Sequence, residues 1–509
     1  MDARERWIIL KKLIPTPSKI DFRDGSDFIL SDGCKIRLSF SGSRSEEKKA
    51  EKIILKAFSD FWKRTPNLSV NASKKGGCGQ EGYKIDISKT LISVSADTVD
   101  GIRNAMKTLR QLAEPVRGLA RTEDFFLVPC SIKDAPVLAF RGIHFCIFPE
   151  TKMWDLEKKI RLAAYHKFNY AVIEAWGVFP FASHPEFSWK GKTIDPKELK
   201  RLIRLGKELG ITLCPQFNIL GHASEARGCT AKHTVLDFAP ELEVLFEPGG
   251  WTWCLSNPYT RQVLADAIAE LLEFYENPPY FHIGCDESLD FATCRDCRRS
   301  NREKLLLDHL TFFNDLIRSR GARTVMWHDM LLVGGPEYSG YIAFGKEADG
   351  LANLWKRLPK DIIIADWQYG YPQKPGSKKE PNWPTNKFFH DHGFDVLVCP
   401  WLNPMGVRSL AKSAKERNLM GLLETTWHKS HSNPSIQTEF VTASDAAWNG
   451  GESRLDECKI NGFASDYSIA THLHMRQICQ DMGITEYEQT GFTDYQISPS
   501  YNCVDEFGS

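Results

Sequence analysis

Short apolar segments alternate with amphipathic helical patterns from Phe140 onward. Eight of these segments are almost continuously apolar, as expected for parallel strands that are covered on both faces. They are Phe140–Phe148, Asn169–Trp176, Thr212–Ile219, Tyr280–Glu287, Arg323–Met330, Asp361–Tyr369, Asp395–Asn403 and Gly421–His428. The helical signal between them is clearest after the second segment. There Asp195 predicts an N-cap, Pro196 a first turn, Glu198 a capping box and Gly210 the helix end.

Eight strand–helix units over about 290 residues agree in number and length with a (β/α)8 barrel. A doubly wound open sheet is the alternative, but no glycine-rich phosphate loop comes after the first strand. We therefore expect an α/β protein in which a (β/α)8 catalytic barrel spans residues 136–450. The C-terminal ends of the barrel strands are then the place to look for chemistry.

A different pattern precedes the barrel. Tyr83–Ile87 and Leu91–Ser95 alternate as half-buried strands do, and Val99–Leu112 carries an apolar face with helical spacing. Residues 1–135 are therefore expected to form a small α+β domain, with a linker to the barrel near Arg117–Glu123. Residues 451–509 are expected to form a C-terminal helical segment and a polar tail.

The balance of positive and negative side chains bears on which kinds of molecule the protein binds. The chain has 509 residues, and its Lys+Arg and Asp+Glu counts are both 65, so its formal net charge is zero. This argues against nucleic acid or an anionic membrane as a partner. No apolar run approaches the length of a membrane span.

Cysteine usage bears on the compartment. The 14 cysteines are scattered, and Cys146, Cys214 and Cys399 fall inside apolar strands. This pattern favours a reducing, cytoplasmic setting over a disulfide scaffold. The first ten residues lack the features of a signal peptide, although processing can remove one, so localisation stays unknown.

The fourth strand ends in two adjacent carboxylates, Asp286 and Glu287. Because side chains alternate along a strand, we expect His282, Gly284 and Asp286 to share one face. Two carboxyl groups in unlike environments can have their pKa values pushed apart, so that one acts as an acid while the other stays charged. The alternative is an ordinary Asp-Glu pair in a solvated loop.

Tryptophan marks five of the eight strand ends. The residues are Trp176, Trp327, Trp367, Trp401 and Trp427. Packing alone would not concentrate tryptophan on the polar rim of a barrel. Aromatic walls with carboxylates, Arg141 and His222 suit a sugar ring, whose faces stack on indoles and whose hydroxyls bind charged groups.

A Cys-x-x-Cys pair, Cys294 and Cys297, comes after the carboxylates. Zinc needs about four ligands, so this pair alone is a weak signal for a structural zinc. Cys229 and His233 lie in the preceding loop and could complete the set. Free thiols are the alternative.

Several motifs resemble the family-20 glycoside hydrolases, the β-N-acetylhexosaminidases. Their H-x-G-G-D-E signature is similar to His282–Glu287, and their P-E-I-D-x-P-G-H-A motif is similar to Pro215–Ala223. Asp134–Gly142 is similar to the family's entry into the first barrel strand, and Ala105–Leu112 to the small domain before it. The resemblance implies a TIM barrel preceded by a small α+β domain.

The chain departs from the family pattern at several positions, and in this it looks like the hexosaminidase D-like branch. Cys285 replaces the second glycine of the signature, and Gln216 and Asn218 replace two acids. The second strand carries Glu174 in place of the family's usual aspartate. The seventh strand has Trp401 and Asn403 where many members have tyrosine and aspartate.

The resemblance implies a retaining exo-β-N-acetylhexosaminidase that releases terminal β-linked GlcNAc or GalNAc through an oxazolinium intermediate. Glu287 would protonate the glycosidic oxygen and Asp286 would hold the substrate acetamido N–H. Other implied roles are ring-hydroxyl binding by Arg141, support of the carboxylates by His222, acetamido-pocket walls from Trp327, Trp367 and Trp427, acetamide donation by Tyr369, and hydroxyl contacts from Glu174 and Asn403.

Other interpretations remain at this point. Arg141 could be a structural ion-pair partner and His222 a satisfied core histidine. The whole chain could be a catalytically silent sugar-binding barrel, or a metal-dependent hydrolase, although it lacks an H-x-H or H-E-x-x-H pattern. The expected partner is a glycan with a terminal N-acetylhexosamine, and no cofactor is required.

Overall fold

The computed structural model describes residues 12–31, 33–64, 66–70, 77–115, 125–149, 151–223, 236, 239–345, 351–370, 381–427, 437–452 and 466–483. The described residues form two compact units. The first is drawn from Met1–Ala139, Arg161–Phe168 and Phe440–Gly491, and the second from Phe140–Ile160, Asn169–Glu439 and Phe492–Ser509. The expected linker near Arg117–Glu123 and the polar tail lie outside the described residues.

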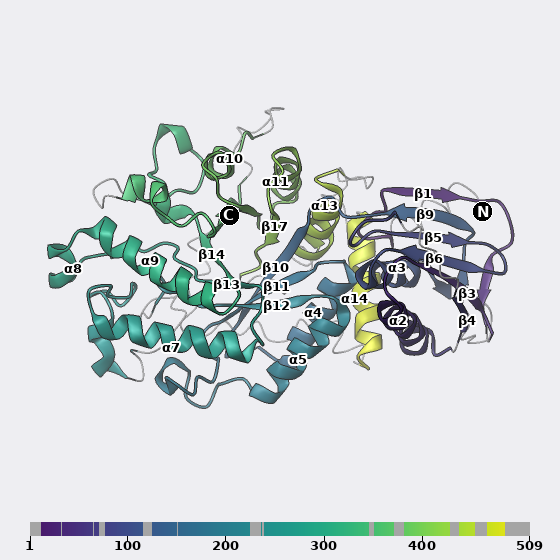
Figure 1. The fold of residues 1–509 in the computed structure, drawn as a ribbon, viewed down its shortest axis with the longest axis horizontal. Coiled ribbons are helices and arrows are strands. Elements are labelled where there is room, and N and C mark those ends of the chain that lie inside the picture. Colours follow the sequence, from purple (N-terminus) through teal and green to yellow (C-terminus); the bar gives the residue numbers. More distant parts are fainter. Residues whose placement is uncertain are drawn as a thin grey trace. The chain divides into compact units, whose positions relative to one another are not determined.

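The second unit is a closed parallel barrel (Figure 1). Its strands are β10 (Phe140–Ile147), β11 (Tyr170–Ala175), β12 (Thr212–Gln216), β13 (Tyr280–His282), β14 (Arg323–Trp327), β15 (Ile363–Trp367), β16 (Val396–Cys399) and β17 (Gly421–Glu424). β10 pairs with both β11 and β17, and the pairing of Phe140 with Gly421 closes the ring. The prediction of eight strands in a (β/α)8 barrel is confirmed.

Helices connect the strands. They are α4 (Met153–Tyr165), α5 (Pro196–Leu209), α7 (Pro258–Phe274), α8 (Arg295–Arg299), α9 (Arg302–Ser319), α10 (Pro384–Asp391) and α11 (Pro404–Glu416), with short turns of other helix types at Pro185–Phe187, Pro240–Leu245, Asp329–Leu331, Pro336–Tyr338, Leu351–Lys356 and Gln437–Thr442. Asp195 caps α5 by accepting from Lys197 N, and Gly210 ends the helix with a φ of 79°. The predicted capping box is wrong, because Glu198 pairs with Arg201 instead. None of the described helices is long and apolar enough to cross a membrane.

The barrel strands end earlier than the apolar pattern predicts. β13 stops at His282, and the next residues turn into left-handed backbone, with φ of 65° at Gly284, 73° at Cys285 and 46° at Glu287. The expectation that strand alternation would carry through to Asp286 is therefore wrong. A tight loop, and not the strand, aims the two carboxylates.

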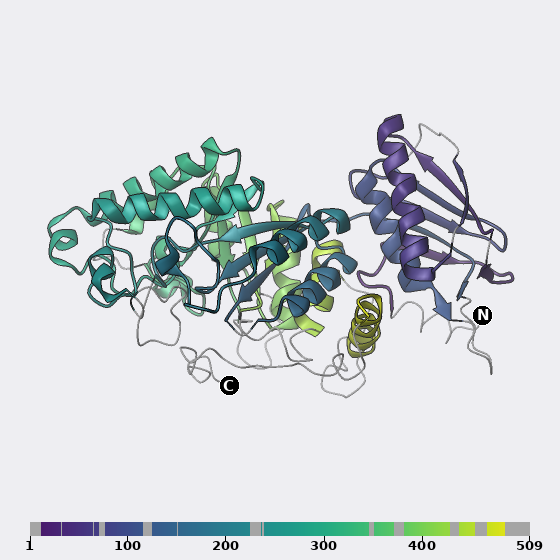
Figure 2. The same ribbon diagram turned by 90° about the horizontal axis from the view of Figure 1, so that it is seen from below.

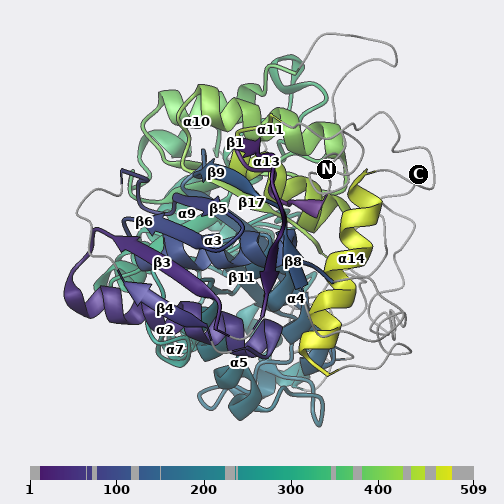
Figure 3. The same cartoon turned by 90° about the vertical axis from the view of Figure 1, so that its right-hand side faces the viewer.

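The first unit has a six-stranded mixed sheet with two helices on one face (Figures 1 and 2). Across the sheet the order is β1 (Lys19–Phe22), β9 (Cys130–Asp134), β5 (Tyr83–Ile87), β6 (Ile92–Ala96), β3 (Lys35–Phe40) and β4 (Asn67–Val70), and these strands are labelled in Figure 3. The helices are α2 (Arg44–Trp62) and α3 (Val99–Leu112). A second small sheet contains β2 (Phe28–Leu30), β8 (Phe125–Leu127) and β7 (Glu114–Pro115). The small α+β domain predicted from the sequence is confirmed.

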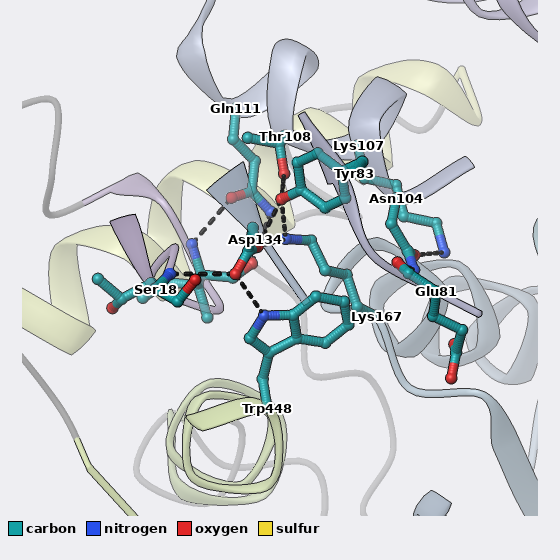
Figure 4. Close-up of polar contacts among 12 residues, drawn as sticks. Ser18, Glu81, Tyr83, Asn104, Lys107, Thr108, Gln111, Asp134, Lys167 and Trp448 are labelled. Atoms are coloured by element: carbon teal, nitrogen blue, oxygen red, sulfur yellow. Dashed lines mark hydrogen bonds and ion pairs between the residues drawn. The ribbon is translucent and has the colours of Figure 1, made fainter. Parts of the chain in front are cut away.

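Two late helices, α13 (Ala443–Asn449) and α14 (Asp466–Asp481), also belong to the first unit. A buried polar network ties α13 to it (Figure 4). Asp134 at the end of β9 accepts from Tyr83 Oη at 2.6 Å and from Trp448 Nε1 at 2.9 Å, and lies 3.2 Å from Lys167 Nζ. Because Asp134 and Lys167 are both fully buried, each satisfies a charge that would be costly to leave unpaired.

Candidate active site

The two carboxylates lie in a tight loop after β13, and this loop requires glycine at two positions. A Cβ on Gly284 would lie 2.0 Å from Asn218 Oδ1, and one on Gly221 would lie 2.1 Å from Asp286 O. Both glycines therefore let the β12 and β13 loops approach each other closely. Asp286 is only 5% exposed, and the Glu287 side chain is 21% exposed. The two neighbouring acids thus differ in their access to water.

His222 joins the two acids. Its Nε2 lies 3.0 Å from Glu287 Oε2 and 3.4 Å from Asp286 Oδ2. The His222 ring packs on the Trp251 indole with a centroid separation of 4.4 Å, and Trp251 Nε1 donates to Glu287 O at 2.6 Å. The structure therefore brings His222 to the carboxylates, as the sequence analysis expected, and holds it there with an aromatic face.

A chain of amides links Asp286 to a third carboxylate. Asn218 Nδ2 donates to Asp286 Oδ1 at 2.9 Å, and Gln216 Nε2 donates to Asn218 Oδ1 at 3.2 Å and to Glu174 Oε1 at 2.7 Å. All these side chains are buried. Gln216 and Asn218, which differ from the family pattern, separate Glu174 from Asp286 with neutral groups that can donate to both.

Glu174 is held on its other oxygen as well. Trp176 Nε1 donates to Glu174 Oε2 at 3.1 Å, and the Cys146 thiol donates to the same oxygen at 3.6 Å. His144 Nε2 lies 3.3 Å from it. Glu174 therefore orients its neighbours, and its predicted contact with substrate hydroxyls stays a prediction.

Asp329 is a further buried carboxyl at the site, from the end of β14. Its Oδ2 accepts from Glu287 N and its Oδ1 from Trp367 Nε1, both at 2.9 Å. Complete burial and the nearby Asp286 charge raise the pKa of Asp329 to about 7. Asp329 fixes the backbone of the Glu287 residue, and near neutral pH it holds a proton that an exposed aspartate would release.

The raised pKa makes stability depend on pH. An unfolded aspartate titrates near pH 4, so between about pH 4 and pH 7 the folded chain binds more protons than the unfolded chain. The contribution of Asp329 to stability is present below pH 4 and is lost as pH rises toward 7. We expect Asp329→Asn to reduce this loss by roughly 1–2 kcal/mol across the window.

The measurement is urea unfolding at several pH values. Asp315→Asn, an exposed carboxylate on α9, is the matched control and should follow the pH dependence of the parent protein. Parallel stability–pH curves for Asp329→Asn and the parent would contradict the assignment.

Aromatic side chains gather beside the acids. Trp367 and Tyr369 have ring centroids 5.0 Å apart, Tyr369 and Trp401 are 5.2 Å apart, and Trp427 Nε1 donates to Tyr369 Oη at 2.7 Å. Burial raises the pKa of Tyr369 well above its ordinary value, so its hydroxyl keeps its proton. Trp327 has no exposed surface, and its ring centroid lies 4.3 Å from that of His282 and 5.8 Å from that of Trp427.

Two further predicted site residues, Arg141 and Asn403, have surroundings of their own. Arg141 is buried, and the alternation of β10 places it on the face opposite His144, with Leu422 as its strand partner. Asn403 caps α11 through Oδ1, which accepts from Met405 N and Gly406 N at 3.1 Å. Their contacts with a sugar stay predictions.

Sequence reasoning did not select Asp329, Trp251 or His144 as site residues. Asp329 comes just after β14, where position alone marks it as a candidate, whereas His144 lies inside β10. Trp251 lies in a long loop, and no local pattern connects it to Glu287. The acids and His222 also form one of the groups of described residues whose possible ligand atoms lie within 4.8 Å of one another.

The chain matches two family models. Residues 11–132 match glycosyl hydrolase family 20, domain 2, and residues 164–436 match the glycosyl hydrolase family 20 catalytic domain. The second match covers more than half of the chain and contains both Asp286 and Glu287.

Individual relatives are distant. The chain is 25% identical to the beta-hexosaminidase subunit beta of Entamoeba histolytica, over 41% of this chain and 38% of the relative. It is 26% identical to hexosaminidase D of Bos taurus, over 32% of this chain and 47% of the relative. The matched stretches thus span less than half the length of these relatives.

The fold has solved counterparts. A family-20 exo-β-N-acetylglucosaminidase from Vibrio harveyi, solved with N-acetylglucosamine, superposes with a TM-score of 0.65 at 16% identity. The superposition covers 93% of this chain and 78% of that one. At this identity the likeness concerns the fold, and it includes the barrel and the domain before it.

Proposed function

Because the chain belongs to glycosyl hydrolase family 20, we propose that it is a retaining exo-β-N-acetylhexosaminidase that releases terminal β-linked GlcNAc or GalNAc. The observation that carries the proposal is the cluster of Asp286, Glu287 and His222, in which a buried and a partly exposed carboxyl meet one histidine. The catalytic-domain match contains this cluster.

In the proposed reaction the substrate acetamido oxygen attacks the anomeric carbon. Glu287, the more exposed acid, protonates the departing glycosidic oxygen and then takes a proton from the incoming water. Its backbone N–H is fixed by Asp329 and its backbone carbonyl by Trp251. The side chain is therefore mounted on a rigid backbone with its carboxyl group beside His222.

Asp286 stabilises the cyclised intermediate in this scheme. Its carboxylate accepts the acetamido N–H and faces the positive charge that develops on the oxazolinium ring. Burial strengthens this interaction, and the Asn218 hydrogen bond keeps the carboxylate oriented. Tyr369, whose oxygen already accepts from Trp427, donates a hydrogen bond from its hydroxyl to the acetamide oxygen.

The proposal needs no cofactor. Glu287 acts first as the acid and then as the base, and the substrate supplies the nucleophile. Two successive inversions at the anomeric carbon retain its configuration. The silent sugar-binding barrel is less favoured, because the Asp-Glu pair, the histidine and the aromatic group are all present together.

Hydrolysis of paired aryl β-GlcNAc and β-GalNAc glycosides tests the proposed activity, with the matching aryl β-glucoside as the control. We expect turnover of one or both N-acetyl sugars, with a rate ratio that gives the sugar preference. The glucoside, which has no acetamido group, should not react appreciably. Folded protein that turns over none of the three would favour the sugar-binding alternative.

A further inference from the structure

Three cysteines and one glutamate meet outside the acid–base cluster. Cys254 Sγ lies 3.7 Å from Cys294 Sγ and 3.7 Å from Cys297 Sγ. One ligand atom from each of these and from Glu247 lies within 4.8 Å of all the others. All three cysteines are unbridged, and Cys254, Cys297 and Glu247 are buried.

The sulfur separations fit a shared metal ion. Two sulfurs bound to one tetrahedral zinc ion at about 2.3 Å lie about 3.8 Å apart. A disulfide needs about 2.05 Å. Both observed separations of 3.7 Å agree with the zinc geometry. Cys254 is common to both pairs, and Cys294 Sγ and Cys297 Sγ lie within 4.8 Å of each other.

Glu247 supplies an independent observation. It is 2% exposed, and its Oε2 accepts from Thr293 N at 2.9 Å and from Cys294 N. Its Oε1 is buried without a hydrogen-bond partner in the described structure. A buried, unpaired carboxylate oxygen is costly, and a cation beside it would remove that cost.

We propose that Glu247, Cys254, Cys294 and Cys297 bind one structural zinc ion. Thiolate sulfur selects zinc over magnesium and calcium, and four protein ligands leave no open position for catalysis. Cys297 N donates to Cys294 Sγ at 3.3 Å, so the first turn of α8 fixes the position of that sulfur. Cys229 and His233, which the sequence suggested as the other ligands, lie outside the described residues.

The position of the four ligands suggests a structural role for the ion. Glu247 and Cys254 lie on a closed turn after β12, in which Glu247 N donates to Thr252 O at 2.7 Å and Cys254 N to Leu245 O at 2.8 Å. Trp251, which holds Glu287, is part of that turn. Cys294 and Cys297 come after Glu287 on the next connection. The ion would therefore join the two connections that carry the acid and its indole support.

Metal analysis of the purified full chain tests the proposal. We expect about one zinc per chain, retained through gel filtration and lost in Cys254→Ser and Cys297→Ser. Cys214→Ser, a buried thiol elsewhere in the barrel, is the matched control and should keep its zinc. Both ligand variants should unfold at lower temperature than the control variant.

Cobalt binding by the parent protein tests the same proposal without relying on the ligand variants, which could fail to fold. Metal-stripped, reduced parent protein should bind Co²⁺ with thiolate charge-transfer absorption and tetrahedral d–d bands, and zinc should displace the cobalt. Glu247→Gln should keep the thiolate absorption but bind the metal more weakly. A reduced parent protein that holds no zinc and shows no thiolate–cobalt absorption overturns the proposal. These readouts do not depend on turnover, so they stand apart from the proposed hydrolase activity.

Discussion

Replacing Glu287 by glutamine should lower kcat on natural glycosides by about 10²–10⁴, the usual contribution of a general acid–base group. Glutamine keeps the shape and the backbone contacts with Asp329 and Trp251 but cannot give up a proton. Because protonation matters most for poor leaving groups, the loss should be smaller for aryl glycosides that release an acidic phenol. Steady-state kinetics on both substrate types measure the difference.

Glu273→Gln is the matched control for this change, since Glu273 is exposed on α7. It should leave kinetics and unfolding unchanged. A Glu287→Gln protein that is folded, by the same unfolding midpoint, and nearly as active as the parent would remove Glu287 from the role of acid.

Asp286→Asn should lower kcat by about 10²–10³, the cost of removing one preorganised electrostatic partner of the transition state. Asparagine keeps the size of Asp286 but loses the charge that faces the oxazolinium ring. The effect should fall on kcat more than on KM, because the positive charge exists only as the substrate cyclises. Unlike Glu287→Gln, the loss should not diminish with a better leaving group.

Kinetics of Asp286→Asn on the same pair of substrates make this comparison. Asp308→Asn, an exposed aspartate on α9, is the control. If Asp286→Asn raised KM with kcat unchanged, Asp286 would be only a ground-state contact.

The barrel could be predicted because its strands are short and almost entirely apolar, a pattern that local sequence carries. β10 shows this most clearly, since all of its eight residues are buried. The α+β domain was equally readable, because β5 alternates buried and partly exposed positions and α3 has one apolar face. The site was located through its position at strand ends and its resemblance to a family signature.

The remaining features depend on contacts between residues far apart in the chain. The direction of the Asp286 side chain results from left-handed backbone at Gly284, Cys285 and Glu287, and a run of apolar residues does not reveal such a conformation. Asp329 reaches Glu287 across 42 positions, and Cys254 reaches Cys294 across 40. Cys285 stands where the family signature has a glycine, and its left-handed backbone, with a φ of 73°, is strained for a residue with a side chain.

The central claim is that the substrate's own acetamido group is the nucleophile at Asp286 and Glu287. The most direct measurement is inhibition of N-acetylhexosaminide hydrolysis by a thiazoline that mimics the cyclised intermediate, in the parent protein and in Asp286→Asn. The account predicts strong competitive inhibition of the parent and much weaker binding to the variant. The reason is that the thiazoline ring would make the same contact with the Asp286 carboxylate as the oxazolinium ring. Turnover that the thiazoline does not inhibit would contradict substrate assistance.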